Sequence, residues 1–521
     1  MEPLRHEDAL TLFSYFALPK DNNSSYVPDE SLIQEVVKAC RGSPLVIQVI
    51  GRSLCQQPYD VWQKMVNSWS QGHSILDLDT NLLNFLQKGF DVLVDKSNVK
   101  ECFMDLGLFP EDQKIPVTAL IDMWTVLYDL DDEGVEAMNI IYRLTSRNLA
   151  NLLITRKVES NTDNFYNNHF IMQHDLLREL AIYQSSQEPF EQRKRLIVDI
   201  NENNHRWSLK EKQQGVIACI SSALLKCCAK LKQQHVIART LSISTDETFT
   251  SDFCDMEPTE TKVMILNVRT KEYSLPAFIE KMRKLMVLLL TNYGFHTTEL
   301  KNFHLLGSLP NLKRIRLEKV SVPSLGTLKN LRKLSLYMCN TSEAFEESTM
   351  PISDALPNLV ELNIDYCKDI VKLPNGICGI KPLKKLSISN CHKFSALPQD
   401  IGNLDNLEVM RLNSCTDLEV IPDSIGKLNK LRFLDISNCI SLRNLPEDIG
   451  NLKNLGVVYM TGCSRCELPM SVAYLEHLKS VTCDEETAAS WEVLKPMLPN
   501  LRIVVPQVDV NLNWLLGTRD S

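Results

Sequence analysis

The cysteines are the residues of this chain whose spacing comes closest to a pattern for metal chemistry. Cys463 and Cys466 form a CxxC pair, which could supply two thiolate ligands to a zinc ion. A structural zinc site needs two further ligands, and no second pair stands at the spacing of such a site. We therefore predict that the chain binds no metal.

Packing explains the regular spacing of the other cysteines better than metal binding does. Of the 16 cysteines, six occupy the same slot of a repeated sequence: Cys339, Cys367, Cys391, Cys415, Cys439 and Cys463. A buried thiol that stacks on the next repeat accounts for this period better than disulfide bonds do. We expect these thiols to be buried and unpaired.

Phosphate chemistry would require a glycine-rich loop of the form GxxxxGK[ST]. The backbone N–H groups and the lysine of such a loop cradle the phosphates of a nucleotide. The sequence contains no such loop. Because triphosphate hydrolysis depends on the charge neutralisation that the loop provides, we predict that this chain is not an enzyme.

A repeated sequence of 24 residues determines how most of the C-terminal half is arranged. Five leucines open successive copies: Leu359, Leu383, Leu407, Leu431 and Leu455. The clearest copy follows the pattern LxxLxLxxCxxLxxLPxxIGxL, which is typical of a leucine-rich repeat. One copy has too few apolar positions to close a core, so the copies must stack into a solenoid with a parallel sheet. We assign the repeats to residues 236–478 and a C-terminal cap to residues 479–521.

The outward positions of the repeat strands are the candidates for binding. Because strand side chains alternate, we expect Leu434 and Ile436 to point inward and Phe433 and Asp435 to point outward. Exposed arginine and aromatic side chains are the usual anchors of protein interfaces. The candidate partner-binding residues are Arg314, Arg316, Tyr337, Arg411, Phe433, Asp435 and Tyr459. The alternative is a sheet face that is merely solvated, since every solenoid has such positions.

Apolar periodicity predicts helices in the N-terminal half, so the fold class is α followed by α/β. Residues 1–95 predict a small helical bundle, in which Gly42 ends one helix and Pro44 begins the next. Residues 96–186 predict three helices, a hairpin and a further helix, which is the order of a winged-helix module. Residues 187–235 are expected to form a helical linker that contains an apolar insertion at 215–231.

Charge and hydropathy disfavour two kinds of partner. The chain has 65 acidic and 56 basic residues, and its formal net charge of -9 disfavours binding to nucleic acid. The sequence has no uncharged run of 18 apolar residues, so we predict no membrane span.

Three short motifs, together with the repeats, resemble those of one protein family. GSPL at residues 42–45 resembles GLPL, CFMDLGLFPED at residues 102–112 resembles CFxxLxxFPED, and QHD at residues 173–175 stands where MHD is expected. The chain is therefore similar to the ARC portion and repeat domain of plant intracellular NLR disease-resistance proteins (NB-ARC leucine-rich-repeat proteins). The QHD variant is most similar to the helper class. Residues 1–95 and 96–186 would then be the first and second ARC subdomains.

The resemblance implies nucleotide contacts for three residues. In the family, His174 would reach the β-phosphate of ADP, Asp175 would hold the loop at the helix start, and Pro44 would pack near the nucleotide. Those roles depend on the phosphate loop that this sequence lacks. The alternative is that His174 and Asp175 are retained for the fold, with Asp175 capping the helix through its carboxylate. We therefore expect no bound ADP or ATP.

The resemblance also implies a function in plant immunity. We expect an N-terminally truncated, non-enzymatic helper-type NLR, in the cytoplasm and also in the nucleus, that binds proteins through its repeats. The implied partners are lipase-like immune-regulator heterodimers or full-length helper NLRs, whose signalling this chain would restrain. One alternative is a fragment of an ATP/ADP-switched resistance receptor that promotes defence. Another is a receptor whose repeats sense a pathogen product directly.

Overall fold

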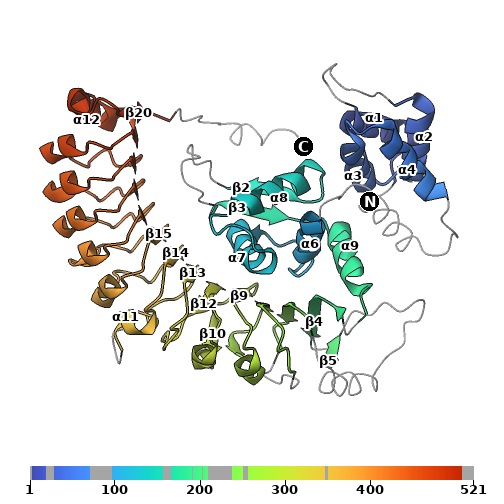
Figure 1. Cartoon of the computed structure of the whole chain (residues 1–521), viewed down its shortest axis with the longest axis horizontal. Coiled ribbons are helices and arrows are strands. Elements are labelled where there is room, and N and C mark those ends of the chain that lie inside the picture. The colour runs from blue at the N-terminus through green and yellow to red at the C-terminus, as the bar shows by residue number, and fades with distance from the viewer. Residues whose placement is uncertain are drawn as a thin grey trace, which may run out of the picture. The chain divides into compact units, whose positions relative to one another are not determined.

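The computed structural model places most of the chain in two compact units (Figure 1). The first unit comprises Met1–Ser244 and Asp255–Asn267, and the second comprises Thr245–Cys254 and Val268–Ser521. The structure describes residues 3–18, 28–40, 42–70, 97–155, 166–189, 192–201, 204–208, 237–249, 256–345 and 350–506. The predicted insertion at 215–231 lies outside these ranges.

Four helices make up the described part of residues 1–95. They are α1 (His6–Ala17), α2 (Glu30–Ala39), α3 (Pro44–Leu54) and α4 (Tyr59–Ser70). The boundary between α2 and α3 follows the sequence prediction. Gly42 has a φ of 70°, and a Cβ atom there would lie 2.6 Å from the Leu4 carbonyl oxygen, so glycine is required. Pro44 occupies the first turn of α3, where its missing N–H costs no hydrogen bond.

Residues 97–186 contain the predicted order of three helices, a strand pair and a further helix. The elements are α6 (Ser97–Leu106), β1 (Ile115–Pro116), α7 (Val117–Tyr128), α8 (Val135–Ser146), β2 (Asn151–Ile154), β3 (His169–Met172) and α9 (Asp175–Ser186). The strands β2 and β3 pair antiparallel, and β1 adds to the other edge of β3.

A strand replaces the helix expected at the start of the linker, so this prediction was wrong. Residues 195–201 form β4 (Arg195–Asn201), which pairs antiparallel with β5 (Asn204–Ser208). Leu196 and Val198 are buried while Ile197 between them is half-buried, an alternation with the period of a strand. Two further strands, β6 (Thr240–Thr245) and β7 (Val263–Val268), continue this sheet in the order β5-β4-β6-β7.

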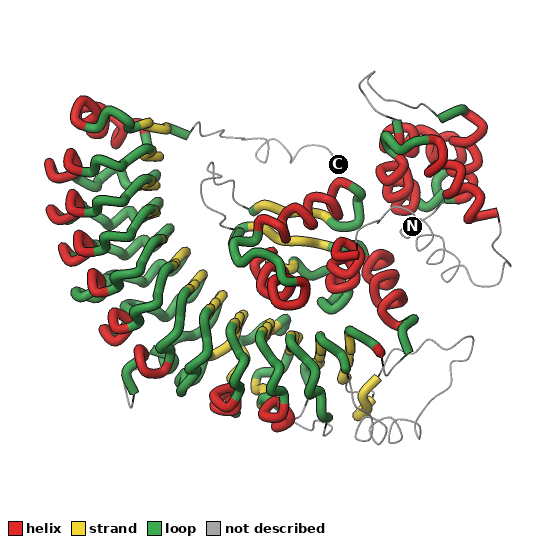
Figure 2. Tube along the Cα trace, in the orientation of Figure 1, coloured by secondary structure: helices red, strands yellow, loops and turns green. Residues whose placement is uncertain are grey.

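The second unit is a solenoid of stacked repeats, as the 24-residue period predicted. One strand of each repeat joins a parallel sheet, in the order β9 (Val287–Asn292), β11 (Arg314–Glu318), β13 (Lys333–Tyr337), β14 (Glu361–Asp365), β15 (Lys385–Ser389), β16 (Val409–Arg411), β17 (Phe433–Asp435), β18 (Val457–Tyr459), β19 (Ser480–Thr482) and β20 (Arg502–Val504). Figure 2 shows these strands in yellow along the inner, concave side of an arc. A smaller parallel sheet contains β8 (Glu272–Ser274), β10 (Thr298–Lys301) and β12 (Val320–Ser321).

Short helices lie on the outer side of the arc, opposite the strands (Figure 2). They are η2 (Ala277–Lys281), η3 (Phe303–Ser308), α11 (Ile352–Ala355), η4 (Asn375–Gly379), η5 (Ile401–Asn403), η6 (Asp423–Lys427), η7 (Glu447–Asn451), η8 (Met470–Tyr474), α12 (Glu485–Leu494) and η9 (Lys495–Met497). The helix α12 covers the last repeats. Its buried Trp491 donates from Nε1 to the Met460 sulfur at 3.3 Å, so it acts as part of the predicted cap.

The core of the solenoid consists of the repeated leucines, isoleucines and cysteines. Leu434 and Ile436 are buried, as alternation predicted, and so are the six cysteines of the repeated slot. The Cys439 thiol donates to the Leu412 carbonyl oxygen of the preceding repeat at 2.9 Å. The cysteine slot is therefore a structural link between repeats, and no disulfide joins cysteines in the described part of the chain.

Candidate functional site

The concave surface of β16, β17 and β18 carries a compact group of side chains. The ladder aligns Val409 with Phe433 and Val457, and it aligns Arg411 with Asp435 and Tyr459. We call Val409, Arg411, Phe433, Val457 and Tyr459 the aromatic–arginine cluster. The guanidinium carbon of Arg411 lies 4.7 Å from the centre of the Phe433 ring, and the Phe433 and Tyr459 rings lie 5.4 Å apart. These distances suit a cation–π contact and a tilted aromatic pair.

The side chains of this cluster are far less exposed than the sequence analysis expected. Arg411, Phe433 and Tyr459 retain only 5%, 8% and 7% of their accessible surface. Neighbouring strands stand about 4.8 Å apart, so each large side chain is covered from both sides by its neighbours in the adjacent repeats. The prediction of freely exposed anchors was therefore wrong, although the residues do lie together on the strand face.

Burial shifts the pKa values of Arg411, which belongs to the cluster, and of Asp435, which lies beside it. Burial lowers the pKa of Arg411 to about 10, while the nearby Asp435 carboxylate acts in the opposite direction. Burial raises the pKa of Asp435, against hydrogen bonds that favour its ionised form. One such bond comes from the Ser437 N–H, 2.9 Å from Oδ1. The cluster thus contains a poorly hydrated cation stacked on one aromatic ring, that of Phe433.

The other three candidate residues form a separate group on β11 and β13. Arg316 lies 2.6 Å from a Glu318 carboxylate oxygen, and its guanidinium carbon is 5.9 Å from the Tyr337 ring centre. Tyr337 in turn meets the Tyr366 ring edge-on at 5.5 Å. Arg314 begins the same strand, β11, and is half-buried. Because Glu318 offsets the charge of Arg316 within the chain, we regard this group as less available to a partner.

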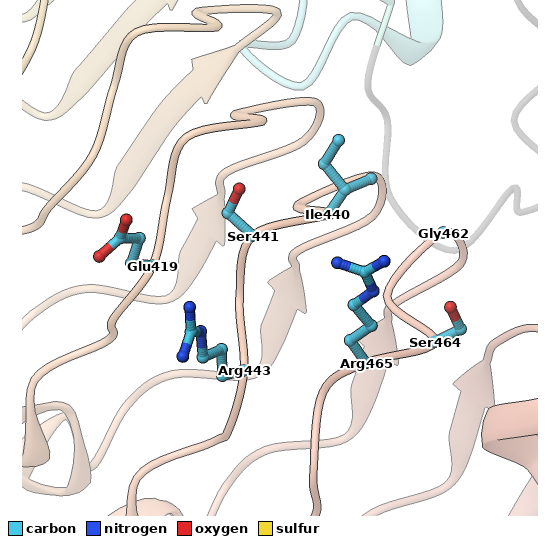
Figure 3. Close-up of a pocket in the computed structure, with 7 residues that line it drawn as sticks. All are labelled: Glu419, Ile440, Ser441, Arg443, Gly462, Ser464 and Arg465. Carbon is cyan, nitrogen blue, oxygen red and sulfur yellow. The ribbon is translucent and has the colours of Figure 1, made fainter.

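A hollow of about 430 Å³ lies among the loops that follow strands β16, β17 and β18. Its lining residues are Glu419, Ile440, Ser441, Arg443, Gly462, Ser464 and Arg465. Figure 3 shows the guanidinium groups of Arg443 and Arg465 on either side of the hollow, with Glu419 beyond Arg443. None of these residues was a candidate from the sequence, because they follow the repeat strands and do not occupy the outward strand positions.

The residues implicated in nucleotide contact lie at two helix starts. His174 is the N-cap of α9, and its Nδ1 accepts a hydrogen bond from the Leu176 N–H at 3.2 Å. The expectation that Asp175 caps this helix was therefore wrong. Asp175 is the first residue of α9, where its carboxylate favours the positive end of the helix dipole. Pro44 begins α3 and is half-buried.

Comparison with known proteins identifies the family. A model described as a leucine-rich repeat region matches residues 262–414 and 401–503. Probable disease resistance protein At5g66890 of Arabidopsis thaliana is 46% identical over 436 residues, which are 82% of this chain and 98% of that protein. The chain belongs to the family of plant disease resistance proteins.

Longer members of the plant disease resistance family match almost the whole chain. Probable disease resistance protein At5g66910 is 47% identical over 525 residues, which cover 99% of this chain and 61% of that protein. Disease resistance protein ADR1 is 39% identical over 520 residues, which cover 99% of this chain and 63% of that protein. Both come from Arabidopsis thaliana, and the chain spans less than two thirds of each.

Two other predicted features of this disease resistance protein can be compared with the structure. Cys463 and Cys466 are both buried, and the described ranges contain no group of three or more His, Cys, Asp or Glu side chains that could hold a metal ion. In the same ranges, no helix is both long and apolar enough to cross a bilayer.

Three residues of the concave surface were not among the binding residues predicted from the sequence. Val409 and Val457 flank Phe433 on either side, and Tyr366 lies against Tyr337. The valines were recognised as outward strand positions, but their packing with the Phe433 ring was not predicted. Tyr366 follows its strand in a left-handed conformation with a φ of 54°, and the same slot holds Asn390, Ser414 and Asn438 in later repeats. That recurring slot is the signal that could have revealed it.

Proposed function

We propose that this plant disease resistance protein acts in defence by binding a protein partner through the aromatic–arginine cluster, without hydrolysing a nucleotide. The observation that carries the proposal is the stacking of Arg411 on Phe433 beside Tyr459. Arginine, tyrosine and other aromatic residues dominate the energetics of protein interfaces, especially where they are already shielded from water. A cluster held in place by its own repeats would also lose little side-chain entropy on binding.

The chemistry of the cluster suits a partner with a carboxylate or an apolar side chain. Burial has removed most of the water from Arg411, so a second carboxylate would recover electrostatic stabilisation there. Val409, Val457 and the two rings pack together as an apolar patch, and the guanidinium stacks on the Phe433 ring of this patch. An apolar side chain of the partner could pack on this patch while an acidic one reaches Arg411.

The residues that the resemblance links to ADP do not fit a nucleotide by themselves. Since His174 Nδ1 accepts the Leu176 N–H, the neutral ring offers only its Nε2 proton to a phosphate. Asp175 is an anion, and Pro44 has no N–H to donate. We therefore propose that this chain works without bound ADP or ATP.

The proposal also includes the module, the class, the location and the partner that the family resemblance implies. We propose that residues 97–186 form a winged-helix module and that the chain is of the helper type, acting in the cytoplasm and the nucleus. Its partner would be a lipase-like immune-regulator heterodimer or a full-length helper NLR. A chain that occupies such a partner without turning over nucleotide would restrain the signalling of full-length members.

Substitution of the two rings tests this proposal in plant leaves. We expect Phe433→Ala and Tyr459→Ala to abolish co-purification of the lipase-like heterodimer and to remove any suppression of helper-dependent cell death. Tyr474→Ala is the matched control, because Tyr474 lies on η8 and is 74% exposed. Circular dichroism of each purified variant checks that the repeats remain folded. Equal association of all variants, or no association of the unmodified chain, would refute the proposal.

A second candidate function rests on the retained GSPL, CFMDLGLFPED and QHD motifs. It treats the chain as part of an ATP/ADP-switched receptor that promotes defence. Isothermal titration of the purified chain with ADP and ATP separates the two functions. Saturable binding of ADP that His174→Ala weakens would favour the switch, whereas the absence of heat is expected for the protein-binding function.

A further inference from the structure

A continuous row of residues, joined by backbone hydrogen bonds, runs along the edge of the solenoid sheet where the strands begin. Each member directly follows a leucine that opens a repeat or the cap, and from the second member on, each N–H donates to the carbonyl oxygen of the member before it at 2.7 to 2.9 Å. The row runs in this order: Lys313, Arg332, Val360, Lys384, Glu408, Arg432, Gly456, Lys479 and Arg502. Successive members are therefore neighbours in space, although they lie up to 28 positions apart in the sequence.

Six of the nine members of this row are basic and only one is acidic, in a chain whose net charge is -9. We call Lys313, Arg332, Lys384, Arg432, Lys479 and Arg502 the basic edge. Lys384 lies 3.4 Å from Glu408, so these two charges offset each other. Among the residues that the structure describes, the other five members have no ion-pair partner. Arg332, Arg432, Lys479 and Arg502 are exposed, and Lys313 is half-buried.

A second set of lysines lies in the turns just before the basic edge. Lys329, Lys381, Lys430 and Lys453 are all exposed. Asparagine side chains link these turns in the same way along the solenoid. For example, Asn358 donates to the Lys329 carbonyl oxygen at 2.8 Å, and Asn406 donates to the Lys381 carbonyl oxygen at 2.9 Å. Lys381 pairs with Asp405 at 3.4 Å. Because Lys381 and Lys384, near the middle of the row, are both paired with carboxylates, most of the excess positive charge lies toward the two ends of the row.

The basic edge adjoins the strand that carries the centre of the aromatic–arginine cluster. Arg432 directly precedes Phe433, and Gly456 directly precedes Val457. A macromolecule that covers the cluster would therefore also come close to Arg432 and its neighbours in the row. Charges placed at the rim of an interface steer association and select partners by their own charge.

We infer that the basic edge docks an acidic surface of the protein partner that covers the aromatic–arginine cluster. This inference rests on the proposed function and adds the charge of the partner to it. A protein partner fits better than a nucleic acid because the row borders apolar and aromatic side chains and the whole chain is acidic. The partner presents several carboxylates in a line along the strand ends, beside an apolar contact.

Charge reversal on opposite edges of the sheet tests this inference. The test variant is Arg432→Glu, Lys479→Glu and Arg502→Glu. The matched control is Lys393→Glu, Arg443→Glu and Arg465→Glu, which makes the same change of net charge. The control residues are exposed and follow the strands, whereas the basic edge precedes them, so in a parallel sheet the two sets lie on opposite edges.

The probe is a fluorescent peptide of glutamates, measured by anisotropy against the full chain. We expect the unmodified chain to bind it in a salt-sensitive manner, the test variant to bind about tenfold more weakly or worse, and the control to bind nearly as the unmodified chain does. Failure of the unmodified chain to bind, or equal weakening in both variants, would overturn the inference. Tighter binding to single-stranded DNA or to phosphatidylserine vesicles, lost in the same test variant, would also overturn it.

The leaf association assay separates this inference from the proposed function. If the basic edge docks the partner, the test variant loses co-purification of the lipase-like heterodimer while the control variant keeps it. If the test variant keeps the partner and Phe433→Ala loses it, the inference about the edge is wrong and the proposed function stands. If Phe433→Ala also keeps the partner, the proposed function fails as well.

Discussion

Arg195 on β4 donates from Nε to a carboxylate oxygen of Asp105 on α6, over 2.6 Å and 90 residues of sequence. The two side chains are only 4% and 1% exposed. The Tyr128 hydroxyl donates to the second Asp105 oxygen at 2.7 Å, and Arg195 also pairs with Glu101 at 2.8 Å. Asp105 belongs to the CFMDLGLFPED stretch, so this part of the motif joins α6 to the first strand beyond α9.

Removal of one partner from the Asp105–Arg195 pair should be strongly destabilising. Arg195→Met leaves a buried carboxylate without its cation, and we expect a loss of about 3–5 kcal/mol in the free energy of unfolding. The double variant Asp105→Leu with Arg195→Met should recover much of that loss, because the buried Asp105 carboxylate is then removed together with its cation. Urea unfolding followed by circular dichroism measures both.

Lys194→Met is the matched control for the buried pair. Lys194 also contacts Glu101, at 3.0 Å, but its side chain is 45% exposed. A pair in that position contributes about 0–1 kcal/mol, so its loss should be small. If Lys194→Met lowered the free energy of unfolding as much as Arg195→Met does, burial would not be the cause of the stabilisation.

Replacement of Gly426 should destabilise the outer layer of the solenoid. A Cβ atom there would lie 2.3 Å from the Asp448 carbonyl oxygen of the next repeat, well inside van der Waals contact. Gly426→Ala must push two short helices apart, and we expect it to destabilise the repeats by about 1–3 kcal/mol. Thermal unfolding of the purified chain measures the change.

Gly456→Ala provides the comparison for Gly426. The nearest atoms to a Cβ at Gly456 are the Arg432 and His477 carbonyl oxygens, at 3.7 and 3.8 Å, which is ordinary contact. We expect this variant to unfold within about 0.5 kcal/mol of the unmodified chain. The explanation by close packing would fail if the two glycines tolerated alanine equally.

The thiols of the repeated cysteine slot should resist alkylation in the folded protein. Burial raises the pKa of Cys415 to about 12 and also raises the pKa of Cys439, so both thiols stay protonated at neutral pH. Peptide mapping after iodoacetamide treatment should find both unlabelled until guanidinium is added. Cys55, half-buried at the end of α3, serves as the reference. Labelling of Cys439 as fast as Cys55 would contradict the structural role of the slot.

The repeat period predicted the solenoid and its core well, because both depend on local spacing. Leu434 and Ile436 are buried for the reason that alternation gives, and each copy stacks in the same register. The low exposure of the Arg411 and Phe433 side chains could not be predicted from the repeat period. It depends on how closely the side chains of three repeats meet on the concave side, which no single copy encodes.

Contacts between distant segments account for the other wrong predictions. Residues 195–201 were expected to be helical from local pattern, but β4 forms because Arg195 pairs with Asp105 and because Leu196 and Val198 alternate into a core. At the start of α9, the cap was assigned to Asp175 from its residue type. His174 takes that position instead, since its Nδ1 can accept the Leu176 N–H.

A double-mutant cycle should reveal the coupling between Arg411 and Phe433 on the concave surface. Arg411→Gln and Phe433→Leu each remove one half of the cation–π contact while keeping most of the side-chain volume. Because the guanidinium is desolvated, we expect a coupling of about 1–2 kcal/mol in the free energy of unfolding, measured in urea. The control cycle combines Arg411→Gln with Tyr337→Leu, which lies three strands away on β13 and should be additive within about 0.5 kcal/mol. Equal coupling in both cycles would mean that the variants disturb the sheet as a whole, and Arg411 would then owe its position to the repeat stacking and not to the ring.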